Sequence, residues 1–567
     1  MSYIFIEGLG GLVLCLVLIE KKLKFLGISL ATLTATTVTL VACGNESKNS
    51  GDNKVINWYI PTEISTLDIS KNTDAYSNLA IGNSGSNLLR IDKEGKPKPD
   101  LAKKVSVSSD GLTYTATLRD NLKWSDGSKL SAEDFVYTWR RIVDPKTASE
   151  YAYLATESHL LNADKINSGD IKDLNKLGVT AKGNQVTFKL TSPCPQFKYY
   201  LAFSNFMPQK QSYVEKVGKD YGTTSKNQIY SGPYLVKDWN GSNGKFKLVK
   251  NKYYWDSKHV KTNSVIVQTI KKPDTAVQMY KQGQIDFAEI SGTSAIYQAN
   301  KNNKDVVDAS DARTTYIIYN QTGSVKALTN QKIRQALNLA TDRKGVVKAA
   351  VDTGSTPAES LVPKKLAKLP NGEDLSKYTA PGYTYNTSKA QKLFKEGLAE
   401  VGQSSLKLTI TADSDSPAAK NAVDYVKSTW ESALPGLTVE EKFVTFKQRL
   451  EDAKNENFDV VLFSWGGDYP EGSTFYGLFT TNSAYNYGKF SSKEYDNAYQ
   501  KAITTDALKP GDAANDYKTA EKALFDQSYY NPVYYLGKKG LQNSKLKGLV
   551  RNSTGLNVDF TYAYKTE

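Results

Sequence analysis

The sequence predicts an α/β protein, because segments with the pattern of β-strands alternate along the chain with segments that have the pattern of helices. The strand-like segments are short runs rich in β-branched and aromatic residues, such as 55–60 and 264–270. The helix-like segments carry apolar residues three and four positions apart, as in 131–143. The chain has 567 residues, 40% of them hydrophobic, and is therefore long enough for two or three domains with separate cores.

The N-terminal third predicts strands and one well-marked helix. The helix begins at Ser131, with Asp134 three residues later as a capping partner, and its apolar side chains follow helical spacing. Asp144 and Pro145 end it, since the residue before a proline disfavours helical geometry. The predicted strands of this part are 55–60, ended by Pro61, then 113–118 and 186–190.

The middle of the chain predicts a hairpin followed by a strand, a helix and a short strand. The hairpin joins 232–236 to 246–249 through the turn residues 240–244. The elements that follow are a strand at 264–270, a helix at 275–282 stopped by Gly283, and a strand at 285–287.

The C-terminal half predicts alternating strands and helices. The run 458–465 is almost continuously apolar, as in a sheet that is covered on both faces. The other elements expected here are an extended run at 315–319, a helix at 330–340, a strand at 406–412, a helix at 417–434 and a strand at 437–444.

The N-terminal region resembles a bacterial lipoprotein signal peptide. Lys21, Lys22 and Lys24 precede an uncharged apolar run, 25–40, and the sequence Leu40-Val41-Ala42-Cys43 follows. In that resemblance the signal region is 1–42, Cys43 becomes the first mature residue and carries lipid on its sulfur, and the polar segment 43–54 is a flexible tether. The alternative is an uncleaved transmembrane anchor, for which the run is short and rich in threonine.

Residues 1–20 fit a signal peptide poorly, because a second apolar run stands before the lysines. We expect either a start codon assigned upstream of the real one, near Val17 or Leu18, or a genuine N-terminal extension. The mass of the unprocessed precursor distinguishes the two.

Composition argues against most kinds of catalytic or metal site. After Cys43 the only cysteine is Cys194, and His159 and His259 stand far apart, so catalytic triads and cysteine or histidine metal clusters are not expected. No Walker A motif is present. The net charge of +14 is dispersed in lysine pairs rather than gathered in one arm, which indicates a solvated surface near anionic lipid or cell-wall polymer rather than a nucleic-acid site. We expect no catalytic residue, no metal and no cofactor.

Several motifs, in one order, resemble the oligopeptide- and dipeptide-binding lipoproteins that serve ABC importers, solute-binding protein family 5. Each motif alone is weak, but the set extends from about residue 55 to the C-terminus. The motifs are Trp124-Ser125-Asp126-Gly127, 132–141, 144–149, Gly232-Pro233-Tyr234, 251–255, 283–286, 333–336 with 341–343, Trp465-Gly466-Gly467-Asp468-Tyr469-Pro470, and Tyr485-Asn486-Tyr487 with Tyr495-Asp496.

The resemblance implies a two-lobed fold like that of the periplasmic binding proteins, of the type II, large peptide-binding class, with an inserted third subdomain and a ligand cleft between the lobes. It implies a first lobe built from 54–85, 203–314 and 525–567, an inserted subdomain at 86–202, and a second lobe at 315–524. The lobes of this family close over the ligand about a hinge.

The resemblance also implies the ligand-binding residues. Asp468 corresponds to the residue that pairs with the free amine of a peptide, and Gly466 and Gly467 would let the ligand backbone approach closely. The segment Tyr316 to Asn320 resembles an edge strand for backbone pairing. The full predicted set is Asp468, Trp465, Gly466, Gly467, Tyr469, Asn486, Tyr487, Tyr316, Ile318, Asn320, Tyr151 and Tyr153.

Two departures from the family pattern concern ligand length and loop shape. Residues 461–464 lack the arginine that some relatives use to reach the carboxyl end of a short peptide, so longer peptides are expected. Pro470-Glu471-Gly472 replaces the more usual Pro-Asp-Pro.

The expected function is that of a monomeric, lipid-anchored binding protein on the outer face of a membrane, at a Gram-positive surface, which captures oligopeptides and delivers them to an ABC importer permease. The alternatives are a relative that binds a peptide pheromone or another solute, a surface hydrolase, and an adhesin or chaperone on the same scaffold.

Overall fold

The computed structural model describes residues 55–291, 293–309, 312–351 and 354–567. The predicted signal region, the lipidation site Cys43 and the tether lie outside the described residues. Within the described ranges, no helix is both long enough and apolar enough to cross a membrane.

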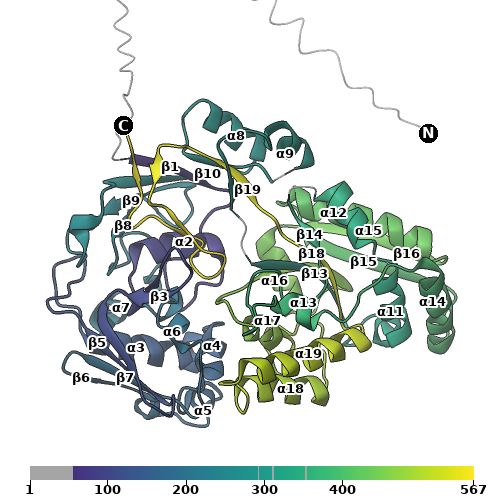
Figure 1. Ribbon diagram of the computed structural model, residues 1–567, viewed down its shortest axis with the longest axis horizontal. Helices are drawn as coiled ribbons and strands as arrows, with labels where there is room; N and C mark the ends of the chain where they lie inside the picture. The colour runs from purple at the N-terminus through teal and green to yellow at the C-terminus, as the bar shows by residue number, and fades with distance from the viewer. Residues whose placement is uncertain (1–54, 292, 310–311, 352–353) are drawn as a thin grey trace, which may run out of the picture. The chain divides into compact units, whose positions relative to one another are not determined.

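The first lobe contains a mixed four-stranded sheet of order β1-β10-β9-β8 and a three-stranded sheet of order β11-β19-β12. β1 and β10 are parallel, and the other pairs are antiparallel. The last segment of the chain returns to this lobe, where β19 and β23 lie beside the teal and purple strands (Figure 1). The elements are β1 (Val55–Ile60), α2 (Ala75–Ser84), α7 (Gln211–Val217), β8 (Tyr234–Lys237), β9 (Lys245–Lys250), β10 (Ser264–Thr269), α8 (Pro273–Lys281), β11 (Phe287–Glu289), α9 (Ser294–Asn300), β12 (Val306–Asp308), β19 (Lys539–Gln542), β20 (Leu546–Lys547), β21 (Val550–Arg551), β22 (Val558–Asp559) and β23 (Tyr564–Lys565).

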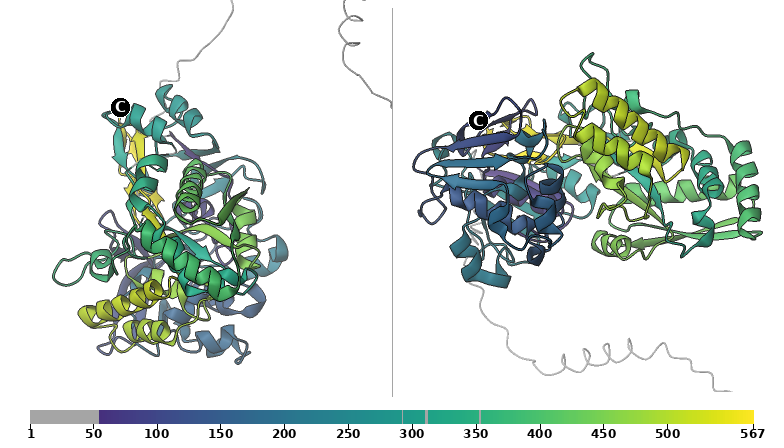
Figure 2. Two further views of the ribbon diagram at one scale, coloured as in Figure 1. Left: turned by 90° about the vertical axis from the view of Figure 1, so that its right-hand side faces the viewer. Right: turned by 90° about the horizontal axis from the view of Figure 1, so that it is seen from below.

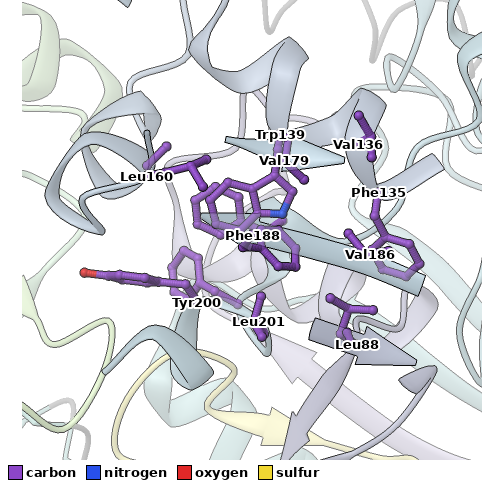
Figure 3. Close-up of a cluster of buried hydrophobic side chains, with 14 of the residues drawn as sticks. Leu88, Phe135, Val136, Trp139, Leu160, Val179, Val186, Phe188, Tyr200 and Leu201 are labelled. Carbon is purple, nitrogen blue, oxygen red and sulfur yellow. The ribbon is translucent and has the colours of Figure 1, made fainter. Parts of the chain in front are cut away.

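A second antiparallel sheet, of order β4-β5-β7-β6, lies within the segment predicted as an inserted subdomain. Helix α3 packs on it with Trp139, which is fully buried beside Phe188 (Figure 3). The Trp139 ring also stacks on Phe206, with ring centroids 3.9 Å apart. The predicted capping box of Ser131 and Asp134 is confirmed. The elements are β2 (Leu89–Ile91), β3 (Pro97–Pro99), β4 (Ala102–Val107), β5 (Thr113–Leu118), α3 (Ala132–Val143), α4 (Ala152–Glu157), α5 (Ala163–Asn167), β6 (Val179–Lys182), β7 (Gln185–Lys189) and α6 (Phe197–Tyr200).

The second lobe is built on a six-stranded sheet of order β14-β18-β13-β17-β15-β16. Side chains that alternate along its central strands enter two hydrophobic clusters, one with α11, α12, α14 and α15 and the other with α13 and α16 to α19, so both faces are covered. Figure 2 shows this lobe from two further sides, with the yellow-green helices α18 and α19 lying together. The elements are β13 (Arg313–Tyr319), α10 (Lys326–Thr329), α11 (Gln331–Leu339), α12 (Arg343–Ala350), β14 (Thr356–Pro357), α13 (Leu375–Thr379), α14 (Thr387–Val401), β15 (Leu406–Asp413), α15 (Pro417–Ala433), β16 (Leu437–Val444), α16 (Phe446–Lys454), β17 (Val460–Gly466), α17 (Ser473–Tyr476), α18 (Lys493–Ile503), α19 (Pro510–Asp526) and β18 (Tyr530–Tyr535).

Two neighbouring strand pairs connect the lobes. β12 pairs with β19 in the first lobe, and β13 pairs with β18 in the second. The chain therefore crosses outward between β12 and β13 and returns between β18 and β19. Because β18 belongs to the six-stranded sheet, the returning tail joins the first lobe after Tyr535, later than the expected boundary at residue 525. The other boundaries expected for the lobes and the inserted subdomain remain a prediction.

Candidate functional site

Asp468 lies just beyond the end of β17, and two tyrosines from the other side of the cleft donate hydrogen bonds to its carboxyl. The Tyr153 hydroxyl donates to Oδ2 at 2.9 Å, and the Tyr151 hydroxyl donates to Oδ1 at 3.3 Å. Both tyrosines come from the segment at the start of α4. Thr474 supports the same carboxyl from the second lobe, since its hydroxyl accepts from the Asp468 backbone N–H at 2.9 Å and lies 3.4 Å from Oδ2. The sequence-predicted residues Asp468, Tyr151 and Tyr153 are thus brought together.

The environment of Asp468 disfavours its charged form. Burial raises the pKa of Asp468 from 3.8 to about 6, although the hydrogen bonds from Tyr153, Tyr151 and Thr474 and the charge of Arg313 act in the opposite direction. Burial and the nearby carboxylate also raise the pKa of both tyrosines, so they remain protonated donors. An enclosed carboxylate of this kind favours a cationic partner, and an amine is the group that matches it in size and hydrogen bonding.

The C-terminal half of β17 presents an open strand edge next to Asp468. On one side β17 pairs with β13 along its whole length, up to Gly466. On the other side, the described register with β15 covers only Val460 and Val461. The backbone of 462–466 can therefore pair with an additional extended strand on that side.

An aromatic wall adjoins this edge. Trp465 packs edge-on against Tyr485, with centroids 4.8 Å apart, and Tyr485 in turn packs against Tyr153 at 5.3 Å. Within the described residues, Trp465 Nε1 and the Tyr485 hydroxyl are buried and have no hydrogen-bond partner. They can therefore bond to a ligand that enters between the lobes.

A cleft runs from Asp468 into the first lobe. Its volume is about 30 Å³, room for about two water molecules, and Phe203, Met207 and Leu556 give it apolar walls. Asn552 also lines it, and the buried Oδ1 of this residue has no partner in the described part of the chain. The site thus combines a carboxylate, a free strand edge and a small cavity of a size that suits water.

The expectation that Tyr316 to Asn320 form an edge strand is wrong. β13 lies inside the six-stranded sheet, between β17 and β18, so its backbone is already paired on both sides. Tyr316, Ile318 and Asn320 are at most 2% exposed, and the Asn320 amide donates to two backbone carbonyls. Their side chains pack in the core of the second lobe. The strand edge that is free to pair belongs to β17.

Three other predicted residues lie in packed positions. Tyr469 is buried, where its hydroxyl accepts from Tyr200 and bonds Ser473. Asn486 holds its own loop through the backbone of Phe490, and Tyr487 packs on Phe463. These contacts join the three residues to other parts of the protein. Their direct contact with a ligand remains a prediction.

The two glycines beside Asp468 make room for the protein's own side chains. A Cβ on Gly466 would lie 2.6 Å from the Arg313 guanidinium, and one on Gly467 would press on Leu366 and Phe475. The predicted role of close approach by a ligand stays a prediction for both.

The sequence analysis missed Tyr485, Thr474 and Arg313 as parts of the site. Tyr485 belongs to the same sequence motif as the predicted Asn486, but the sequence does not indicate that its ring packs against Trp465. Arg313 pairs with Gly466 in the sheet, and from there its charge lowers the pKa of Asp468. No local sequence pattern indicates this pairing.

Comparison with known proteins gives a family match over most of the chain. Residues 96–487 match the model for bacterial extracellular solute-binding proteins, family 5. A protein named dipeptide-binding protein, from Lactococcus lactis subsp. cremoris, is 44% identical over 556 residues, which covers 96% of this chain and 100% of that protein.

Solved structures agree with this match. Listeria monocytogenes OppA bound to peptide superposes with a TM-score of 0.84 at 32% identity, covering 91% of this chain and 99% of that one. The murein tripeptide binding protein MppA of Escherichia coli gives 0.82 at 28% identity, over 90% and 98% of the two chains. MppA in its unliganded open form gives only 0.64 at 28% identity, over 91% and 98%. The lobes described here therefore match the peptide-bound OppA and this first MppA structure better than the unliganded open form, and the chain belongs to family 5 of the bacterial extracellular solute-binding proteins.

Proposed function

We propose that this protein is an extracellular, lipid-anchored binding component of an ABC importer that captures oligopeptides between its two lobes. It holds the free amine of the peptide at Asp468, closes over it, and delivers it to the membrane permease. It carries out no chemistry on the peptide.

The observation that carries this proposal is the enclosed carboxyl of Asp468, held by Tyr151 and Tyr153 from the opposite side of the cleft. Because enclosure disfavours the charge, a cation is needed to compensate it, and the α-amine is a cation that every unblocked peptide has.

The open edge of β17 supports a peptide over other amines. An extended peptide can add to 462–466 as a further strand, which recognises the backbone whatever the side chains are. The Trp465 Nε1–H group, which has no partner in the described part of the chain, is a donor beside this edge. The adjoining cavity leaves space for ordered water.

The proposal also includes a lipid anchor and a transporter partner. The anchor lies in a part of the chain outside the described residues. Cys43 would carry the lipid, and the polar segment after it would let the lobes reach a permease. The names of the relatives, one a dipeptide-binding protein and one an OppA bound to peptide, support a peptide importer.

Native mass spectrometry tests the proposal directly. The full-length protein is incubated with a mixture of tri- to hexa-alanine, free or N-acetylated, next to the Asp468→Ala variant. We expect discrete adducts of intact free peptides, weakened by acetylation and by the variant. Cleaved peptides would indicate a hydrolase, and no adduct with any peptide would contradict peptide capture.

A further inference from the structure

The two lobes meet at a contact that encloses the carboxyl of Glu157, one oxygen of which is buried without a hydrogen-bond partner among the described residues. The segment 150–200 reaches the second lobe through hydrogen bonds that we call the closing contact. Apart from the bonds of Tyr151 and Tyr153 to Asp468, these are Tyr200 to Tyr469 at 3.1 Å, His159 Nε2 with the Ile503 carbonyl at 2.8 Å, Lys454 to Glu150 at 2.7 Å, and Tyr499 to Glu157 at 2.9 Å.

Glu157 stands at the end of α4 and faces η6 (Gly477–Phe479) and α18 of the other lobe. Its Oε1 accepts the Tyr499 hydroxyl, and a Cβ placed on Gly477 would lie 2.5 Å from it, so the carboxyl sits directly against that backbone. Its Oε2 is buried and has no partner among the described residues. Ionisation of a carboxyl is costly when one of its oxygens is buried without a donor.

The charges around Glu157 do not compensate it. The acidic groups that act on it are Asp468 and Glu471, both in the loop after β17. His159 lies two residues away, and burial lowers the pKa of His159, which keeps it neutral. The other titratable groups that interact with Glu157 are neutral thiol and phenol groups whose pKa burial raises, namely Tyr153, Cys194, Tyr200, Tyr469, Tyr495 and Tyr499.

We propose that closure of the two lobes takes up one proton from solvent at the Glu157 carboxyl, so that capture of the ligand is coupled to pH. A ligand can enter the cleft only if the closing contact separates, and separation returns Glu157 to water, where the carboxyl is ionised. Protonation removes the uncompensated charge and turns the buried oxygen into a hydroxyl. The choice of a peptide as the ligand rests on the proposed function, whereas proton uptake on closure does not depend on which ligand binds.

The sign of the coupling follows from the two environments. Burial raises the pKa of Glu157 to about 8 in the closed form, against an ordinary value of 4.5 when the carboxyl is solvated. Between these values the closed form binds a proton that the open form lacks, so ligand affinity falls by about tenfold for each unit of rising pH. Above the pKa of the closed form the dependence ends.

Isothermal titration calorimetry of the full-length protein with tetra-alanine at pH 6.5 tests this, in two buffers of different ionisation enthalpy. At this pH the peptide amine is already protonated, so it contributes little. We expect the wild type to take up about one proton per peptide bound and the Glu157→Gln variant to take up none. Between pH 5.5 and 7.5 the affinity of the wild type is expected to fall by about tenfold for each pH unit, and that of the variant is expected to lose this dependence. Glu150→Gln is the matched control, because it removes a carboxylate of the same contact that is paired with Lys454, and it should keep the proton uptake.

Equal proton uptake in the wild type and Glu157→Gln would overturn the coupling. If tetra-alanine binds to neither protein, the proposed function is at fault, and hydrogen–deuterium exchange of the segment 495–505 without peptide decides the coupling. A ratio of exchange rates between wild type and Glu157→Gln that grows from pH 6 to pH 8 supports it, and a constant ratio overturns it.

Discussion

Removal of the charge at Asp468 should abolish the preference for a free amine, and the structure gives the size of the effect. The substitution Asp468→Asn keeps the shape of the side chain and an acceptor for Tyr153. In the wild type, a pKa raised from 3.8 to about 6 means that the enclosed, ligand-free carboxylate is disfavoured by about 3 kcal/mol at pH 7, at 1.36 kcal/mol per pKa unit. A peptide whose amine is acetylated leaves that charge uncompensated, whereas a free amine neutralises it.

The assay is a double-mutant cycle with two proteins and two ligands, measured by calorimetry at pH 7. Acetylation of a tetrapeptide should weaken binding to the wild type by about 3 kcal/mol, roughly 100-fold, and to Asp468→Asn by much less. The coupling energy between Asp468 and the amine is the difference of the two losses. If acetylation costs the same in both proteins, the amine is not held by Asp468 and the assignment of the site is refuted.

Three further predictions concern other residues. Tyr153→Phe removes the 2.9 Å donor to Asp468 and should weaken peptide binding by about 1.5 to 3 kcal/mol in the same calorimetry, and an unchanged affinity would exclude this role. Burial raises the pKa of Glu521 to about 7 from 4.5, so the folded state holds a proton that the unfolded state loses, and stability falls by about 3 kcal/mol as pH rises from 4.5 to 7. Denaturant titrations should show that loss in the wild type and not in Glu521→Gln, whereas parallel pH profiles would contradict it. Trp139→Ala should destabilise by about 3 to 5 kcal/mol in urea unfolding, while the exposed Val107→Ala stays within about 0.5 kcal/mol, and equal effects would contradict the stacked core.

Local sequence patterns predicted the elements well. The strands β1, β5 and β16 begin and end at the predicted residues, because period-two or β-branched runs bounded by turn residues are read directly from neighbours in the chain. The helix α3 begins after its predicted cap, since Ser131 and Asp134 bond each other's backbone. Most other boundaries shifted by one to three residues, as for β11, where Phe287–Glu289 replaces the expected 285–287.

The order of strands could not be predicted in this way. β13 was expected at an edge, but its neighbours β17 and β18 lie far along the chain, and their pairing depends on which faces the helices of the second lobe cover. The same holds for the site. The family resemblance pointed to Asp468, while its hydrogen bond with Tyr153 joins residues 315 positions apart and that of Glu157 with Tyr499 joins residues 342 apart.

The two enclosed carboxyls give a physical reason why the lobes should close on a ligand rather than on an empty cleft. Closing around Asp468 without an amine leaves a disfavoured charge, and three hydroxyl donors reduce that cost only in part. Among the described residues Glu157 has a single donor, and in the proposed coupling it meets its own cost by binding a proton, which solvent supplies whether or not a ligand is present. Only the cost at Asp468 depends on the ligand. In the proposed function Asp468 therefore distinguishes an occupied cleft from an empty one, and in the proposed coupling Glu157 sets how readily either form closes at a given pH.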